Sequence, residues 1–132
     1  MITIRAYRNS DFDLISSWWD QHGEIGPIPG CMVEDGTFVL ELDKQPVMSL
    51  TVYLTQSKAI SYFEGYVSKP GLSKDIRNKA GNLIFNHAFQ YAKSHGYQYM
   101  VGYCGKTRLT SRYQQLGFTP SISHLTSLFK EI

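Results

Sequence analysis

Cysteine is scarce in this sequence, and its scarcity argues against two classes of small protein. The two cysteines, Cys31 and Cys104, lie far apart and match no metal-ligand spacing. The four histidines are scattered and form no ligand cluster. We therefore expect neither a disulfide framework nor a metal site, and we expect both thiols to stay free in a reducing cytoplasm.

Long hydrophobic runs are also missing. No stretch reaches the roughly 18 apolar residues of a transmembrane helix. The first residues, MITIRAYRNSDFD, contain no apolar core and turn acidic early, which is unlike a secretory signal. Both absences predict a cytoplasmic protein without a membrane partner.

A large net charge is absent as well. The 13 basic and 11 acidic side chains leave a formal charge of +2, and so small a charge does not indicate a nucleic-acid-binding surface. The chain has 132 residues, of which 42% are hydrophobic and 18% are charged. This composition is typical of a globular protein, and the length predicts a single domain over residues 1–132.

The apolar residues recur with two alternating periods, which predict strands and helices in turn. The expected strands are residues 2–7, 37–42, 47–55, 59–68, 97–103 and 123–130. The expected helices begin at Ser10 with Asp13 in the first turn, at about Ile76, and near Leu109, and they end at Gly23, Gly96 and Gly117. The order β-α-β-β-β-α-β-α-β predicts an α/β (α+β) fold, with a single mixed, mostly antiparallel central sheet flanked by helices.

Gly105-Lys106-Thr107 is placed like part of a phosphate-binding loop, because it follows an expected strand and opens an expected helix. However, Met100 stands where that motif needs its first glycine. An ordinary strand-to-helix turn explains the tripeptide better. A nucleotide-binding module is therefore only a remote alternative.

The start of the long helix, SKDIRNKAGN, is a second candidate for an anion site. A helix N-terminus presents backbone N–H groups and the positive end of the dipole. Lys74, Arg77 and Lys79 add positive charge, and Ala80 and Gly81 allow close backbone approach. A pyrophosphate would fit here, although a solvated basic first turn explains the same residues equally well.

The short helix near the end of the chain closes with the motif Tyr113-Gln114-Gln115-Leu116-Gly117-Phe118. Preceded by a meander and a strand–loop–helix–strand segment, this motif resembles the GNAT superfamily of N-acetyltransferases. The resemblance covers nearly the whole chain. It implies an acyltransferase that uses acetyl-CoA (CoA) as cofactor and acetylates an amine on a small molecule or a peptide, and it allows a homodimer.

The family's cofactor loop has the pattern Arg/Gln-x-x-Gly-x-Gly/Ala, and this chain departs from it. One register uses Arg77, Ala80 and Asn82, whereas the other uses Ile76, Lys79 and Gly81. We prefer the second register, because it keeps the final glycine and fits the helix face better. The implied cofactor contacts are Ile76, Arg77, Asn78, Lys79, Ala80, Gly81 and Asn82. Because the loop is degenerate, a GNAT-fold binding protein that has lost catalysis is the alternative.

The resemblance also implies roles for the strand that precedes this helix. In the family two parallel strands separate, here 59–68 and 97–103, and the pantetheine arm of CoA replaces the missing ladder partner. The backbone of Tyr66, Val67 and Ser68 would then hold the arm and polarise the thioester carbonyl. Lys106 falls where the family often has an Asn that contacts the cofactor.

Two residues are candidates for proton transfer. Tyr113 matches the family's tyrosine that is proposed as general acid, although a packing role fits its spacing too. Glu64 lies where some family members place a general base, and its face also carries Tyr62 and Tyr66, an aromatic setting that would desolvate the carboxylate. The alternative for Glu64 is an exposed strand carboxylate.

Acceptor recognition would fall to the first expected helix and the loop after it. The candidates are Trp18, Trp19, His22, the GEIGPIPG loop and the segment after Phe118. Because Trp18 and Trp19 are adjacent, they cannot share one helix face. One of them would then lie in the core and the other at the surface or at a pocket, but we favour the interpretation that both are partly packed.

Overall fold

The computed structural model describes residues 1–104, 107–120, 128 and 130–132. They divide into two compact units, Met1–Gly102 and Tyr103–Ile132. The strand expected over residues 123–130 lies largely outside the described residues, as does Lys106. None of the described helices combines the length and hydrophobicity needed to span a bilayer.

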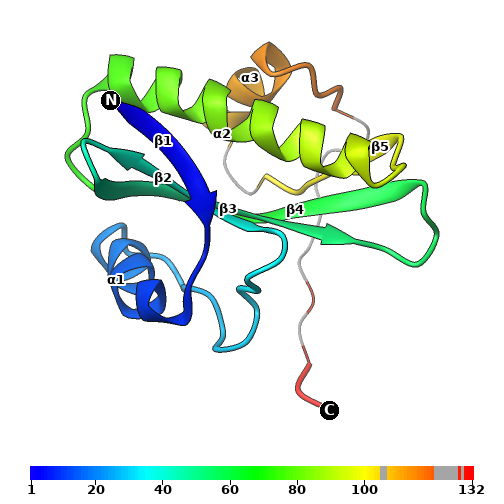
Figure 1. Cartoon of the computed structure of the whole chain (residues 1–132), viewed down its shortest axis with the longest axis horizontal. Helices are drawn as coiled ribbons and strands as arrows, with labels where there is room; N and C mark the ends of the chain where they lie inside the picture. The colour runs from blue at the N-terminus through cyan, green and yellow to red at the C-terminus, as the bar shows by residue number, and fades with distance from the viewer. Residues whose placement is uncertain (105–106, 121–127, 129) are drawn as a thin grey trace. The chain divides into compact units, whose positions relative to one another are not determined.

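The first unit contains a five-stranded sheet (Figure 1). Its strands are β1 (Ile2–Ala6), β2 (Thr37–Leu42), β3 (Gln45–Leu54), β4 (Ile60–Ser68) and β5 (Tyr99–Val101), and they are hydrogen-bonded in that order. The three pairs from β1 to β4 are antiparallel, and β4 pairs with β5 in parallel. These pairings confirm the expected mixed, mostly antiparallel sheet.

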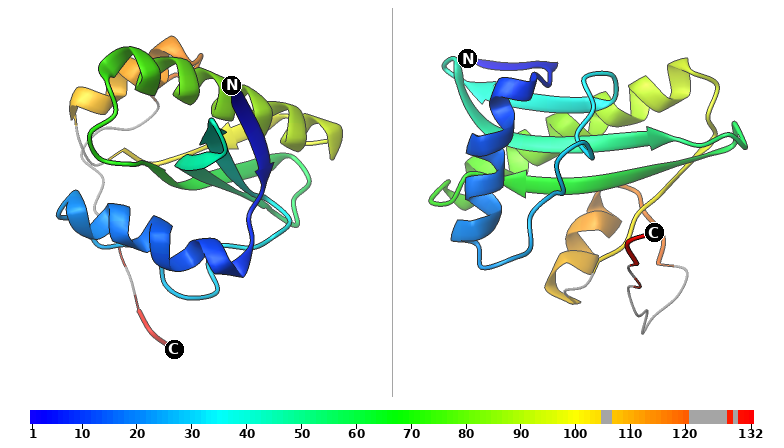
Figure 2. Two further views of the ribbon diagram at one scale, coloured as in Figure 1. Left: turned by 60° about the vertical axis from the view of Figure 1, so that its left-hand side comes forward. Right: turned by 90° about the horizontal axis from the view of Figure 1, so that it is seen from below.

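The helices of the first unit cover opposite faces of this sheet (Figure 2). A 3-10 turn, η1 (Asn9–Asp11), leads into α1 (Phe12–Gln21), and α2 (Lys74–Ser94) connects β4 to β5. The second unit contains α3 (Thr107–Gln115). Within the described residues, the element order therefore agrees with the one expected from the sequence.

Each sheet face has its own apolar core. Toward α1, a buried cluster combines residues of the helix, the strands and the loops, namely Tyr7, Ile15, Trp18, Met32, Val39 and Val67. Toward α2, Phe38 packs edge-on against His87 and Tyr91, at centroid distances of 4.6 and 5.1 Å. On the same face, Phe63 packs against Phe85 at 5.1 Å. Burial on both faces fixes the strand register, because a one-residue slip would exchange the two cores.

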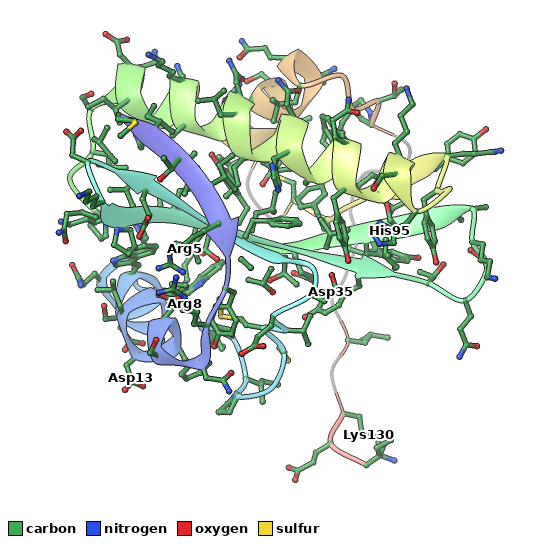
Figure 3. All side chains as sticks on the ribbon, in the orientation of Figure 1. Arg5, Arg8, Asp13, Asp35, His95 and Lys130 are labelled. Carbon is green, nitrogen blue, oxygen red and sulfur yellow. The ribbon has the colours of Figure 1, made fainter. Side chains whose placement is uncertain are left out.

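The N-terminus of α2 begins two residues before the expected one. Ser73 is its N-cap, and its hydroxyl accepts the Ile76 N–H at 3.3 Å. The chain leaves α2 at Gly96, whose φ of +88° favours glycine. His95, the C-cap residue, lies at this end of the helix (Figure 3).

The expected start of the first helix, with Ser10 and Asp13, is wrong. The carboxylate of Asp11 instead accepts the Arg8 N–H at 2.8 Å, so Asp11 closes the entry turn. Strand β5 is also shorter than the expected residues 97–103. The Tyr97 N–H donates to Ala92 O at 3.1 Å, so Tyr97 belongs to the turn after α2 and not to the strand.

Candidate functional site

A β-bulge interrupts β4 near its C-terminal end. Glu64 opposes Thr51 and Val67 opposes Ser49, so two residues, Gly65 and Tyr66, face the single residue between them on β3. Gly65 has a φ of +63°, a left-handed conformation that favours glycine and is typical of such a bulge. The only sequence signal for the bulge is a glycine within a strand pattern.

The bulge changes which face of the sheet Tyr66 occupies. Its ring packs against Phe85 of α2 at a centroid distance of 4.9 Å, on the face that also receives Phe63. The expectation that Tyr66 shares a face with Glu64 is therefore wrong, because strict alternation does not hold across a bulge. The neighbouring Val67 is buried in the cluster under α1.

Glu64 is exposed to solvent. Its charge acts on Tyr53 of β3. Burial, followed by the charges of Cys31 and Glu64, raises the pKa of Tyr53. The Tyr53 hydroxyl donates to the Cys31 carbonyl oxygen at 2.6 Å, which ties the loop after α1 to the sheet. Glu64 thus lies on the side of the sheet that carries this loop.

Beyond the bulge, β4 continues past the end of β5, its parallel neighbour, and we call the β5-facing side of this part of β4 its outer edge. The β4–β5 pairing consists of Ile60–Tyr99, Ser61–Met100 and Tyr62–Val101, whereas β4 continues to Ser68. The Lys69 N–H donates to Val47 O at 2.8 Å, and the adjacent pair is Ser68–Met48. In an antiparallel ladder this adjacent pair is non-hydrogen-bonded, so the backbone groups of Ser68 point away from β3.

His22, the C-cap residue of α1, contacts this edge. Its Nε2 lies 2.8 Å from the carbonyl oxygen of Ser68. Of the two tryptophans before it, Trp18 is 1% exposed in the core and Trp19 is half-buried, so the favoured expectation that both are partly packed is wrong for Trp18. Trp19 packs against Gly26 in the following loop, where an added Cβ would lie 3.1 Å from the Trp19 Cβ.

The start of α2 places the predicted pyrophosphate contacts on the helix itself. A helix leaves the N–H groups of its N-cap and its first three residues without an intrahelical acceptor, here those of residues 73–76. The Ser73 hydroxyl accepts one of them, the Ile76 N–H, and the Ser73 carbonyl accepts the Arg77 N–H at 2.9 Å as the first intrahelical bond. Of the residues predicted to contact the cofactor here, five are exposed and two are buried: Ile76, Arg77, Asn78, Lys79 and Asn82 are exposed, and Ala80 and Gly81 are buried.

Tyr113 belongs to the second unit. It lies on α3 and is half-buried. Its ring packs edge-on against Phe118 at a centroid distance of 6.0 Å, and its carbonyl accepts the Phe118 N–H at 3.1 Å. Gly117, with a φ of +99°, makes this return of the chain possible. The Tyr-x-x-Leu-Gly-Phe motif therefore forms a compact helix end.

Most of the acidic residues lie in one segment of the sequence, a concentration of negative charge that the small net charge of the whole chain does not reveal. Residues 9–43 contain no Lys or Arg, and their acidic residues are Asp11, Asp13, Asp20, Glu24, Glu34, Asp35, Glu41 and Asp43. Arg5 pairs with two of them, Asp11 and Glu41. The segment includes α1 and the loop after it. Among the described residues, no group of three or more His, Cys, Asp or Glu side chains is arranged to hold a metal ion.

No family model matches the sequence, and no curated protein matches it. Solved structures do match the fold. Glucosamine-6-phosphate N-acetyltransferase from Arabidopsis thaliana is 14% identical, with a TM-score of 0.70 over 98% of this chain and 99% of that chain. A transcriptional regulator from Bacillus halodurans is 20% identical, with a TM-score of 0.73 over 98% of this chain and 100% of that chain.

A third match includes a bound cofactor. N-acetylglutamate synthase from Neisseria gonorrhoeae, complexed with coenzyme A and L-arginine, is 12% identical, with a TM-score of 0.72. The match covers 96% of this chain and 29% of that one. At these identities the likeness concerns the fold alone, and it confirms the GNAT-type fold that the sequence motif implied.

Proposed function

We propose that this protein is an acetyl-CoA-dependent N-acetyltransferase that transfers the acetyl group directly to an amine of its acceptor. The observation that supports this proposal is the extended outer edge of β4, where a bulge at Gly65 precedes backbone groups that point away from β3. Such an edge can hydrogen-bond an amide-bearing arm as it would a neighbouring strand. When bound, acetyl-CoA supplies the acetyl group as a reactive thioester.

In this proposal the backbone segment of Tyr66, Val67 and Ser68 holds the arm through the groups that point away from β3, which include those of Ser68 but not those of Val67. An N–H group at the bulge would be aimed at the carbonyl oxygen that becomes negative during transfer. In measured oxyanion holes, one such donor contributes about 3 kcal/mol to transition-state stabilisation. Gly65 supports this arrangement, because its left-handed conformation turns the backbone at this point.

The start of α2 is the proposed site for the pyrophosphate, through the residues from Ile76 to Asn82. The exposed side chains of Lys74, Arg77 and Lys79 give it positive charge. The positive end of the helix dipole favours an anion there. Lys106 would contribute a further contact with the cofactor.

Two side chains would move protons. Glu64 would accept the proton that the acceptor amine loses, directly or through a water molecule. Tyr113 would donate its phenolic proton to the departing thiolate, because a phenol with a pKa of about 10 is protonated at neutral pH. The exposure of Glu64 on the side of the sheet that carries the acceptor loop supports its role.

The acceptor class follows from charge. An amine is cationic at neutral pH, and the acidic segment over residues 9–43 would raise its local concentration. A small amine and a basic peptide both satisfy this condition. The protein would act in the cytoplasm, and the fold also allows a homodimer.

A GNAT-fold binding protein without catalysis is the second candidate. The observation that favours it is the start of α2, where the Ser73 hydroxyl already accepts the N–H group of Ile76. Fewer backbone donors then remain for a pyrophosphate. One structural neighbour is a transcriptional regulator, and a regulatory binding role would be compatible with this reading.

The deciding experiment is thermal denaturation with acetyl-CoA, CoA or ATP, followed by transfer assays on a panel of amines. A ligand at 100 times its dissociation constant stabilises a protein by about 2.7 kcal/mol. We expect stabilisation by acetyl-CoA and CoA but not by ATP, together with amine-dependent release of thiol. Stabilisation without transfer would favour the binding protein, and stabilisation by ATP alone would favour the nucleotide-binding module.

A further inference from the structure

The contact between His22 and Ser68 joins the end of α1 to the outer edge of β4. The Ser68 carbonyl can only accept a hydrogen bond, so the His22 Nε2 at 2.8 Å carries the proton and donates it. His22 is itself exposed. Its ring therefore supplies one directed N–H group from the helix to the sheet edge.

This hydrogen bond is not needed to hold α1 on the sheet. Ile15 and Trp18 are each 1% exposed, and they pack into the same buried cluster as Val67. Burial of these large apolar side chains anchors the helix on the sheet. A single exposed hydrogen bond contributes much less to stability than this burial. The effect of His22 should therefore be local to the carbonyl that it contacts.

That carbonyl belongs to the strand edge on which the proposed cofactor arm lies. Ser68 directs its backbone groups away from β3, beyond the last β4–β5 pair at Tyr62. A carbonyl oxygen has two lone pairs, of which His22 uses one. The second is available to an amide N–H of the arm.

We propose that His22 is a positioning residue for the cofactor, which orients the Ser68 carbonyl toward the arm and thereby couples α1 to cofactor binding. The inference rests on the proposed function. It assigns to His22 a role toward the cofactor, in contrast to the acceptor-side role expected from its place after the first helix.

The test compares CoA with 3′-phospho-ADP, which carries the pyrophosphate but no arm, by titration calorimetry on the full chain. His22→Phe keeps a ring but removes the donor, and we expect about fivefold weaker CoA binding, the loss of roughly one hydrogen bond. Binding of 3′-phospho-ADP should be unchanged. His22→Gln retains an N–H donor and should bind CoA within about twofold of the parent.

His95 offers a matched control. It is the C-cap residue of α2, is exposed, and contacts a backbone carbonyl at 2.8 Å, but that carbonyl belongs to Tyr91 in its own helix. His95→Phe should therefore leave CoA binding unchanged.

The outcomes separate this inference from the proposed function. If the parent protein binds CoA but His22→Phe binds it equally well or more tightly, only the inference is overturned. The inference is also overturned if His22→Phe binds both CoA and 3′-phospho-ADP more weakly, because displacement of α1 would then be the cause. It is likewise overturned if His22→Gln binds CoA as weakly as His22→Phe does. If the parent protein binds no CoA, both the inference and the proposed function are overturned.

Discussion

The guanidinium group of Arg5 on β1 holds the Asp11 carboxylate through two hydrogen bonds of 2.8 Å each. Its Nε donates at 3.0 Å to Glu41 on β2. Arg5 lies where the end of β1 passes α1 (Figure 3). The carboxylate of Asp11 also accepts the Arg8 N–H, so one side chain links the sheet edge to the entry of α1. Planar guanidinium and carboxylate groups favour such a two-point contact.

The Asp11 contact predicts a specific loss of stability in acid. The hydrogen bonds from Arg5 lower the pKa of Asp11 below its ordinary value of 3.8. Its contribution is therefore complete above pH 3.8 and is lost as the pH falls through the lower pKa of the folded state. Asp11→Asn should cost about 2 kcal/mol at neutral pH, and its stability should fall less steeply in acid than that of the parent.

Urea denaturation between pH 2 and pH 7 measures this difference. Asp13→Asn is the matched control, because Asp13 is an exposed acid in the first turn of α1. It should leave the acid limb of the stability curve unchanged. If Asp11→Asn and the parent have parallel curves, the Arg5 contact does not stabilise the ionised carboxylate.

At the end of the first unit, Gly102 leaves no space for a larger residue beside Phe63, which predicts a steric coupling between these two positions. A Cβ built on Gly102 would lie 2.0 Å from Cε1 of the Phe63 ring. Gly102→Ala should therefore cost about 1–3 kcal/mol, as overpacked cores do. In the double variant Gly102→Ala/Phe63→Leu the smaller side chain should recover part of this loss. Strictly additive free energies of unfolding would show that the two residues do not compete for the same space.

Regular elements could be predicted from the sequence, because their signals are local. The alternation from Thr37 to Leu42 gave the correct bounds of β2. For α2, the residues at helical spacing, Ala80, Ile84 and Ala88, are buried, and Gly96 ends the helix as expected. One face of α2 packs on the sheet, so its burial repeats with the helical period, whereas Thr37–Leu40 of β2 are all buried because both faces of the sheet are covered.

The candidate site depends on features that are not local. A glycine within a strand signals a possible bulge, but the bulge at Gly65 is defined only by the register with β3. That register moves Tyr66 to the α2 face. In the same way, Asp11 rather than Asp13 closes the entry turn of α1, where Arg5 from another element reaches it. The His22–Ser68 contact spans 46 residues, so no sequence window contains both partners.

Substitution of Glu64 should change the pH–rate profile of acetyl transfer. If it accepts the amine proton, Glu64→Gln should lower the transfer rate at neutral pH by at least about a hundredfold, the range for general base catalysis. CoA affinity should be nearly unchanged, and the acidic limb of the profile should disappear. Glu131→Gln, at an exposed carboxylate outside the acidic segment, should alter neither. A parent-like profile in Glu64→Gln would leave Glu64 as an ordinary exposed strand residue.

A substitution at Tyr113 should separate the catalytic role of its hydroxyl from the packing role of its ring. Tyr113→Phe keeps the ring, and with it the edge-on contact with Phe118, so the variant should fold and bind CoA like the parent. A proton donated to the sulfur stabilises the thiolate only as the C–S bond breaks. Because that interaction exists in the transition state and not in the ground state, its loss lowers kcat with little change in KM.

We therefore expect Tyr113→Phe to acetylate the same amine at least about tenfold more slowly, which is a small effect for acid catalysis. The comparison should be made well below pH 8, because a free thiol has a pKa of about 8.5 and the donor matters most when the departing sulfur must be protonated. Tyr99→Phe, at an exposed tyrosine of β5, serves as the control for losing a hydroxyl. Equal rates for Tyr113→Phe and the parent would make Tyr113 a packing residue of the α3 end and assign the acid to another group. A lower kcat with unchanged CoA affinity and an unchanged melting temperature would identify the phenol as the donor, because a packing defect would reduce stability or binding together with the rate.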